Sequence, residues 1–186
     1  MSKLRVAVIG CGRISVTYAQ AFRELQEEVQ VCFAVDKVKE RAQAFAQQFP
    51  GCGWSDRYQD LLDARPDVVH VCTPHFLHKE HVCRALRAGC HVLTEKPIAL
   101  SIADAEEMMR TARESGRQLG VISQNRYIDG IREAKRLLDS GALGRVTGAW
   151  STLNWHRPPS YYECDWKGSW EKEGGGVVTA STWCGI

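Results

Sequence analysis

The segment LRVAVIGCGRIS, residues 4–15, decides the fold. Leu4–Ile9 is an apolar run of strand-forming residues that leads directly into Gly10 and Gly12, the first two glycines of a GxGxxG pattern, with Ser15 in place of the third. The first glycine permits a tight turn, the second lets backbone approach a pyrophosphate, and the following helix presents unpaired N–H groups at a positive dipole end. The segment therefore predicts a strand, turn and helix that bind a dinucleotide.

An acidic residue at the end of the next apolar run fits the same prediction. Val29–Val35 is followed by Asp36, whose carboxylate would accept hydrogen bonds from the adenosine ribose hydroxyls and repel a 2′-phosphate. This arrangement favours NAD over NADP, although Lys37 and Arg41 keep NADP open. The alternative at this stage is that the glycines only make a tight turn and that the acid caps the next helix.

Short apolar runs alternate with amphipathic segments over the first two thirds of the chain. Ser101 with Asp104 three residues later resembles a capping box, and Gly89 and Gly116 follow two helix ends. Such alternation predicts a doubly wound parallel sheet covered by helices on both faces, an α/β domain over residues 1–123. The predicted strands are Leu4–Ile9, Val29–Val35, Asp67–Val71, His91–Leu93 and Leu119–Ile122, and the predicted helices span 13–26, 37–48, 78–88 and 101–115.

The sequence changes character near residue 125. A further amphipathic helix, with apolar residues from Ile128 to Leu138, stops at Gly141. Arg145–Trp155 is rich in Thr and Trp and predicts one long strand. Residues 124–186 are therefore predicted to begin a second domain.

Composition and charge exclude several classes of protein. Of the 186 residues 44% are apolar and 25% charged, which is typical of a globular protein, and a net charge of +2 gives no field to attract nucleic acid or an anionic membrane. The 8 cysteines include no CxxC pair, so zinc-ribbon and thioredoxin-like sites lack their spacing. No apolar stretch approaches the ~18–20 residues of a membrane helix. We therefore expect a cytoplasmic protein without a nucleic-acid or membrane partner.

Two further motifs end predicted strands. Cys72-Thr73-Pro74-His75 follows one strand, and Glu95-Lys96-Pro97 follows the next. In an open parallel sheet ligands bind beyond the carboxyl ends of the strands, so both motifs are predicted on the same edge as the glycine turn.

Together these motifs closely resemble the Gfo/Idh/MocA family of nicotinamide-dependent oxidoreductases. The resemblance covers residues 3–176, includes Asn125-Arg126-Tyr127, and is most specific at Glu95-Lys96-Pro97. It implies a Rossmann domain followed by an α/β domain with an antiparallel sheet, which carries substrate specificity and often forms the oligomer interface. The implied activity is hydride transfer between NAD or NADP and a carbinol of a sugar, inositol or related polyol, in a homo-oligomer.

The resemblance also assigns roles to individual residues. Lys96 is predicted to be catalytic, because an ammonium beside the reacting hydroxyl stabilises alkoxide character, and its bond to Pro97 is expected to be cis. For Lys96 the alternative is an ordinary surface lysine. For Tyr162 and Trp166 the alternative is that they are exposed aromatic residues that only pack. The predicted cofactor-binding residues are Gly10, Gly12, Arg13, Ile14, Asp36, Cys72, Thr73, Pro74, His75, His78, Glu95, Lys96 and Asn125, and the predicted substrate contacts are Lys96, Arg126, Tyr162 and Trp166.

Three histidines at three-residue spacing raise the question of a metal. His75, His78 and His81 would retreat by about 60° per step around a helix, so they do not converge on one ion. No metal site is predicted. His78 is expected near the cofactor, with a structural histidine as the alternative.

The chain departs from the family pattern after Gly174-Gly175-Gly176. The family pattern continues as GGGxxxDxGxHxxD, but residues 177–186 contain neither the Asp nor the His. We therefore expect a chain truncated in its C-terminal domain, for example by a frameshift just beyond Gly176, with impaired turnover and with self-association through the orphan strand. The alternatives are a catalytically inactive nucleotide-binding or partner-binding module, or a remnant without function.

Overall fold

The structure is a computed structural model that describes residues 2–150, 152, 154 and 156–175. The chain divides into two compact units, Met1–Ile122 and Ser123–Ile186, each of which is considered by itself.

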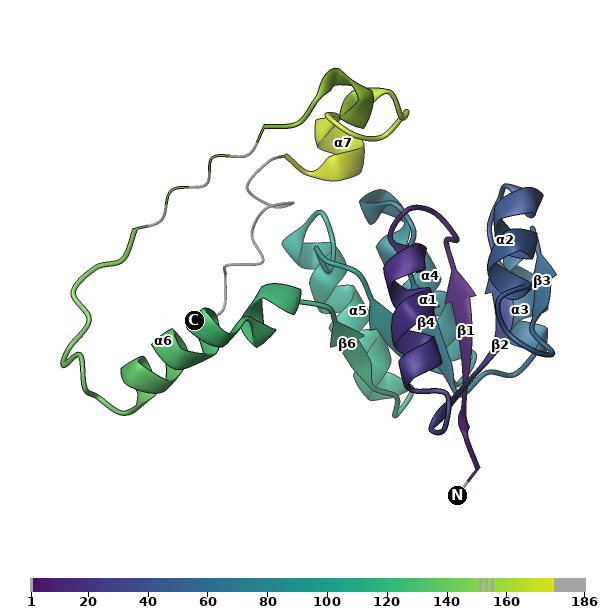
Figure 1. The fold of residues 1–186 in the computed structure, drawn as a ribbon, viewed down its shortest axis with the longest axis horizontal. Coiled ribbons are helices and arrows are strands. Elements are labelled where there is room, and N and C mark those ends of the chain that lie inside the picture. Colours follow the sequence, from purple (N-terminus) through teal and green to yellow (C-terminus); the bar gives the residue numbers. More distant parts are fainter. Residues whose placement is uncertain (1, 151, 153, 155, 176–186) are drawn as a thin grey trace. The chain divides into compact units, whose positions relative to one another are not determined.

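A six-stranded sheet forms the centre of the N-terminal unit (Figure 1). Its strands are β1 (Leu4–Ile9), β2 (Val29–Val35), β3 (Gly53–Ser55), β4 (Val68–Val71), β5 (His91–Thr94) and β6 (Leu119–Val121). They lie in the order β3-β2-β1-β4-β5-β6, and every neighbouring pair is parallel. This is the strand order of a Rossmann fold.

The register of the sheet brings four strand ends into one row. Ile9 pairs with Val35 on one side and with Val71 on the other, and Val71 in turn pairs with Thr94. The residues that follow these strands therefore emerge side by side at one edge of the sheet.

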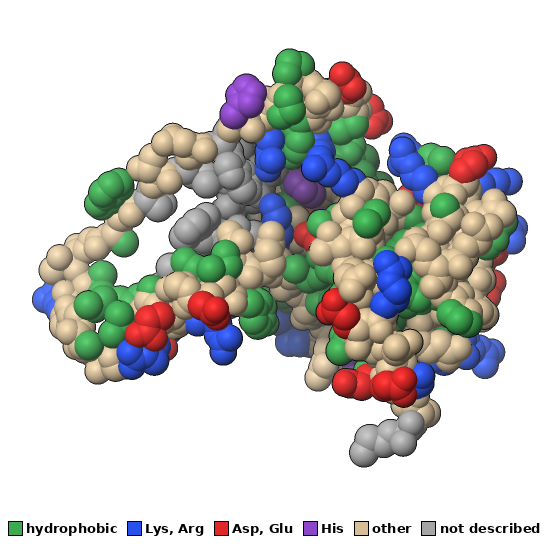
Figure 2. Space-filling view, viewed as in Figure 1, with side chains coloured by type: hydrophobic (Ala, Val, Ile, Leu, Met, Phe, Trp, Pro, Cys, Tyr) green, Lys and Arg blue, Asp and Glu red, His purple; other side chains and the backbone are tan. Residues whose placement is uncertain are grey.

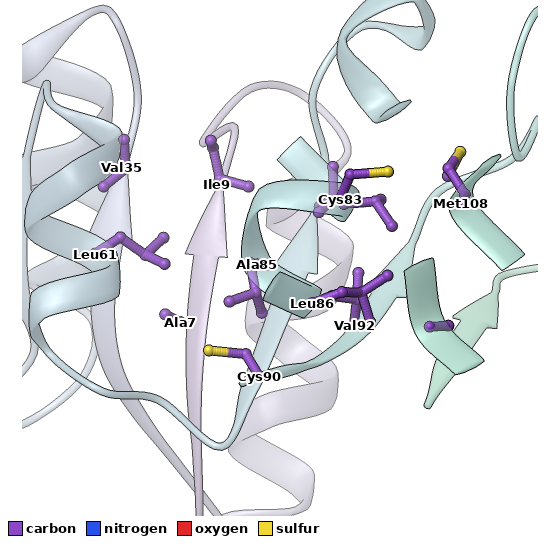
Figure 3. Close-up of a cluster of buried hydrophobic side chains, with 14 residues drawn as sticks. Ala7, Ile9, Val35, Leu61, Cys83, Ala85, Leu86, Cys90, Val92 and Met108 are labelled. Carbon is purple, nitrogen blue, oxygen red and sulfur yellow. The ribbon is translucent and has the colours of Figure 1, made fainter. Parts of the chain in front are cut away.

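Helices cover both faces of the sheet. The central strand β1 alternates between the two faces: Ala7 and Ile9 pack with Leu61, Leu86 and their neighbours (Figure 3), and Val8 packs into the cluster on the opposite face. Side chains of α1 (Ser15–Glu24) and α2 (Lys39–Ala46) complete one cluster, and side chains of α3 (Tyr58–Asp63), α4 (His78–Arg87) and α5 (Ile102–Glu114) complete the other. Both faces of the sheet are thus buried, as parallel sheets require.

The predicted elements of this unit are confirmed to within two residues at each end. The Ser101 hydroxyl accepts a hydrogen bond from the Asp104 N–H at 3.1 Å, and Gly89 and Gly116 have φ values of 87° and 62°, as predicted for helix ends. The short elements β3 and α3 were not predicted. Strand β3 has only 3 residues and α3 only 6, too few for hydrophobic periodicity to show.

The described residues of the C-terminal unit form helices, 3₁₀ turns and irregular segments. The unit contains the 3₁₀ turns η2 (Gln124–Tyr127) and η3 (Pro159–Tyr162) and the α-helices α6 (Asp129–Asp139) and α7 (Trp170–Glu173). Helix α6 confirms the predicted amphipathic helix, and Gly141 follows it at φ 71°. A buried carboxylate organises the second part of the unit, because Glu173 accepts hydrogen bonds from the Gly168 N–H at 2.5 Å and the Tyr161 hydroxyl at 3.3 Å.

The prediction of a strand over Arg145–Trp155 is wrong for its described residues. Residues 145–150, 152 and 154 have no strand structure, and the predicted antiparallel sheet has no strand among the described residues of this unit. High β-propensity does not suffice, because a strand is stabilised by hydrogen bonds to a neighbouring strand.

Gly10 should be essential for folding, whereas Gly12 should not. Gly10 has φ +91°, and a Cβ atom there would lie 2.7 Å from the backbone carbonyl carbon and oxygen of Cys72. A Cβ atom on Gly12 would meet nothing within 4 Å. We expect Gly10→Ala to lower the free energy of unfolding by at least about 2 kcal/mol and Gly12→Ala to change it by less than about 1 kcal/mol, measured by urea denaturation. Equal unfolding midpoints for the two variants would contradict the steric argument.

A buried histidine should make the stability of the N-terminal unit sensitive to pH. His70 on β4 is 1% exposed, and its ring packs against Tyr18 and Phe22 of α1. Neither ring nitrogen has a hydrogen-bond partner among the residues that the structure describes. Burial lowers the pKa of His70 from 6.5 to about 4. The unfolded chain therefore binds a proton near pH 6.5 that the folded chain binds only near pH 4, and stability falls as the pH falls through this window.

Substitution of this histidine provides the test. We expect His70→Phe to reduce the loss of unfolding free energy between pH 7.5 and pH 4.5 by roughly 2–3 kcal/mol, measured by urea denaturation at both pH values. His81, whose pKa burial also lowers to about 4, is present in both proteins and its contribution cancels. Parallel pH profiles for the two proteins would show that His70 does not carry the effect.

Candidate functional site

The candidate site lies at the carboxyl edge of the sheet in the N-terminal unit. Backbone hydrogen bonds extend the strand pairing one residue beyond the strands. The Gly10 N–H donates to the Val35 carbonyl at 2.8 Å, the Cys72 N–H to the Ile9 carbonyl at 2.8 Å, and the Glu95 N–H to the Val71 carbonyl at 3.0 Å. The glycine turn and the motifs that begin at Cys72 and Glu95 are thereby brought together, as the sequence predicts.

The turn between β1 and α1 fits a pyrophosphate. The buried Ser15 hydroxyl donates to the Gly12 carbonyl at 2.6 Å, so this side chain closes the turn against the helix. Among the described residues no side chain caps the N-terminus of α1, and a Cβ atom on Gly12 would have none of their atoms within 4 Å. The Ser15 and Thr17 N–H groups donate to the Gly12 and Ile14 carbonyls at 3.2 and 3.1 Å, and the positive end of the helix dipole lies beside the open space at Gly12. Such a helix N-terminus favours an anion. Arg13 and Ile14 are exposed in the same turn.

Asp36 supports the turn directly. Its side chain is largely buried, and its two carboxylate oxygens accept hydrogen bonds from the Cys11 N–H at 2.8 Å and the Val38 N–H at 2.9 Å. Each oxygen keeps further acceptor capacity, so ribose hydroxyls can be added to these two bonds. Val38 is the residue immediately before α2. Its hydrogen bond to Asp36 therefore agrees in part with the alternative that Asp36 caps the next helix.

His78 connects the two loops that carry the other motifs. Its ring is fully buried, with Nε2 2.9 Å from the carbonyl oxygen of Thr73 and Nδ1 2.8 Å from that of Pro97. Burial lowers the pKa of His78, and the two carbonyl contacts oppose that shift. The geometry favours the structural role considered for this histidine, and a contact with the cofactor stays a prediction.

The loop after β4 contains an unsatisfied polar atom. Thr73 Oγ1 is buried and has no hydrogen-bond partner in the described part of the chain, which fits a polar ligand at this edge. Pro74 precedes the 3₁₀ turn η1 (His75–Leu77), which leads into α4. The Cys72 thiol is buried, and burial raises its pKa, so this residue can contribute only through its backbone.

Glu95 and Lys96 directly follow β5 and are half-buried. The Glu95 carboxylate accepts the Lys96 backbone N–H at 3.1 Å through Oε2 and the Tyr18 hydroxyl through Oε1. The Lys96–Pro97 bond is cis, as expected. Tyr18 was not predicted as a site residue. The available signal was its position on α1 four residues before Phe22, on the face that packs against the sheet.

The remaining predicted residues belong to the C-terminal unit. Asn125 is half-buried and Arg126 is exposed, both in η2. Tyr162 in η3 is exposed and lies edge-on to Tyr161, with 5.1 Å between ring centroids. Trp166 is half-buried, and the Lys167 ammonium lies 5.6 Å from its ring.

Two further features are absent from the described residues. No group of three or more His, Cys, Asp or Glu side chains in them is arranged to hold a metal ion. None of their helices has the length and apolar character that a bilayer-spanning helix needs. On the face shown in Figure 2, acidic and basic side chains are interspersed over the N-terminal unit.

Comparison with known families agrees with this geometry. Residues 4–123 match the profile described as the oxidoreductase family with an NAD-binding Rossmann fold, GFO_IDH_MocA, and residues 131–182 match the GFO/IDH/MocA C-terminal domain. The chain belongs to the Gfo/Idh/MocA oxidoreductase family. Its N-terminal unit is therefore an NAD-binding Rossmann domain. The second match continues past Gly176, where the sequence motif is lost, and the residues from 176 onward lie outside the described structure.

Individual relatives are identical to this chain at about a third of the aligned positions. The D-glucoside 3-dehydrogenase of Escherichia coli (strain K12) is 34% identical over 146 residues, which are 78% of this chain and 42% of that protein. The 2,7-anhydro-N-acetylneuraminate hydratase of Mediterraneibacter gnavus is 34% identical over 178 residues, 94% of this chain and 46% of that protein. The chain thus spans about half the length of these relatives.

A solved structure shows the same fold. The WlbA dehydrogenase from Bordetella pertussis, in complex with NADH and UDP-GlcNAcA, superposes with a TM-score of 0.88 at 29% identity. The match covers 97% of this chain and 53% of that one.

Removal of the His78 ring should loosen both loops. We expect His78→Leu to lower the free energy of unfolding by about 2 kcal/mol or more, because the carbonyl oxygen that accepts the ring N–H loses its donor and the contact between the two loops is lost. His78→Gln, whose amide can donate to a carbonyl, should lose less. Urea denaturation of both variants measures the difference, and a leucine variant as stable as the parent would contradict the connecting role.

Proposed function

We propose that this protein is an NAD-dependent oxidoreductase that transfers hydride between nicotinamide and a carbinol of a sugar, inositol or related polyol. One observation supports this most directly: the sheet register aligns the glycine turn, Asp36 and the Glu95-Lys96 pair along one edge. A dinucleotide laid along that edge would extend from the pyrophosphate site at α1 to the lysine.

The residues at the edge suit a division of roles. The turn at Gly10–Ile14 and the N-terminus of α1 would bind the pyrophosphate, and Asp36 the adenosine ribose. Thr73, Pro74 and His75 would line the nicotinamide ribose, and Glu95 would lie near the cofactor. When bound, NAD supplies the hydride acceptor. Lys96 would donate a hydrogen bond to the reacting hydroxyl and stabilise negative charge on its oxygen.

The C-terminal residues complete the proposal. Asn125 would face the cofactor, and Arg126, Tyr162 and Trp166 would contact the substrate, in a domain that begins at residue 124 and forms a homo-oligomer. The seven cysteines of the described residues are free thiols, which supports a reducing, cytoplasmic location. Lys37 and Arg41, next to Asp36 in sequence, keep NADP as a second cofactor.

A second function is favoured by a different observation. Residues 177–186 contain neither the Asp nor the His of the family's GGGxxxDxGxHxxD pattern. A chain without these acid/base groups would bind the nucleotide, or a partner protein, without turnover.

Nucleotide titration tests the shared part of both proposals. We expect the 186-residue chain to bind NADH saturably, with at least tenfold weaker binding of NADPH, measured by nicotinamide fluorescence. Gly12→Ala should weaken NADH binding at least tenfold, because its Cβ occupies the space open to the pyrophosphate. Unchanged affinity in this variant, or no binding by the parent, would contradict the proposed site.

Turnover then separates the two functions. Formation of NADH from NAD with a panel of sugars, inositols and polyols, abolished in Lys96→Met without loss of NADH binding, supports the oxidoreductase. Binding without turnover by every substrate supports the nucleotide-binding module.

A further inference from the structure

We propose that Tyr18 is a positioning residue for the nicotinamide end of the site and acts through Glu95. This inference rests on the proposed function, because it assumes that the Glu95-Lys96 pair lies beside the nicotinamide. Of the predicted site residues, Glu95 is the hydrogen-bond partner of the Tyr18 hydroxyl in the described part of the chain.

The hydrogen bonds to Glu95 restrict its carboxylate on both sides. One oxygen accepts the Tyr18 hydroxyl, and the other accepts the Lys96 backbone N–H at 3.1 Å. A carboxylate held at both oxygens has little freedom to rotate. Tyr18 therefore fixes the orientation of Glu95, and through it the backbone at Lys96.

The Tyr18 ring is itself held in place. It packs edge-on against the buried His70 ring, with 4.1 Å between centroids and 64° between planes. Burial, and next the hydrogen bond to Glu95, raise the pKa of the Tyr18 hydroxyl well above its ordinary value. The hydroxyl thus stays protonated and serves as a donor.

This contact joins two separate parts of the site. Tyr18 is the fourth residue of α1, the helix whose N-terminus faces the pyrophosphate space, and Glu95 follows β5, two strands away from β1. Loss of the hydroxyl should disturb the nicotinamide end and leave the adenosine and pyrophosphate contacts intact.

Two ligands distinguish a positioning role of the Tyr18 hydroxyl from a general loss of structure in α1 or the glycine turn. NADH occupies the whole proposed site, whereas ADP-ribose lacks the nicotinamide. We expect Tyr18→Phe, which keeps the ring and removes only the hydroxyl, to weaken NADH binding about tenfold and ADP-ribose binding less than twofold, measured by isothermal titration calorimetry.

Tyr58→Phe is the matched control. The Tyr58 hydroxyl donates to the His81 carbonyl at 2.8 Å and lies on α3, which packs against the opposite face of the sheet from α1. This variant loses one half-buried tyrosine hydroxyl and should bind both ligands like the parent. In a Glu95→Ala background Tyr18→Phe should have no further effect on NADH affinity, because its partner is gone.

Each other result overturns the inference. Equal loss of both ligands in Tyr18→Phe would show damage to α1 or the turn, and unchanged NADH binding would show that the hydroxyl has no positioning role. A parent chain that binds neither ligand overturns the proposed function together with this inference. A parent chain that binds both, with Tyr18→Phe binding equally well, overturns only the inference.

Discussion

The pairing register of the parallel sheet is the constraint on which the site depends. Because Val35, Ile9, Val71 and Thr94 occupy one row, the residues after them lie along one edge of the sheet although up to 85 positions separate them in the sequence. A shift by one residue in any pair would turn the side chains of that strand to the opposite face and bury the wrong ones. Packing of both faces of β1 therefore protects the register, and the register in turn aligns the site.

A few tight contacts then fix the loops on this edge. Gly10 passes so close to the Cys72 backbone that no side chain fits, Asp36 holds the Cys11 N–H, and His78 spans from Thr73 to Pro97. These contacts involve backbone atoms of the loops. They fix the conformation of the loops and do not depend on which side chains are exposed there. The exposed residues remain available to bind ligand.

Most elements of the N-terminal unit could be predicted from the sequence, because the local pattern of residues and the packing of the fold favour the same structure there. Apolar runs, the glycine turn at Gly10 and the cap at Ser101 each have a local physical cause, and each is present. The short β3, the Tyr18–Glu95 contact and the buried bonds of His78 depend on pairing across the fold, which periodicity does not encode. The Arg145–Trp155 prediction failed for the same reason, since strand propensity was not matched by a neighbouring strand in the described residues.

The two backbone bonds of Asp36 limit how cofactor preference can change in this protein. Replacing an acid at this position with a small neutral residue is the direct way to admit a 2′-phosphate, but here it would also release the Cys11 N–H inside the turn. A switch towards NADP would therefore weaken the pyrophosphate site that both cofactors share. Substitutions at Lys37 and Arg41 would disturb the turn less, because their side chains form no hydrogen bond or ion pair within the described part of the chain.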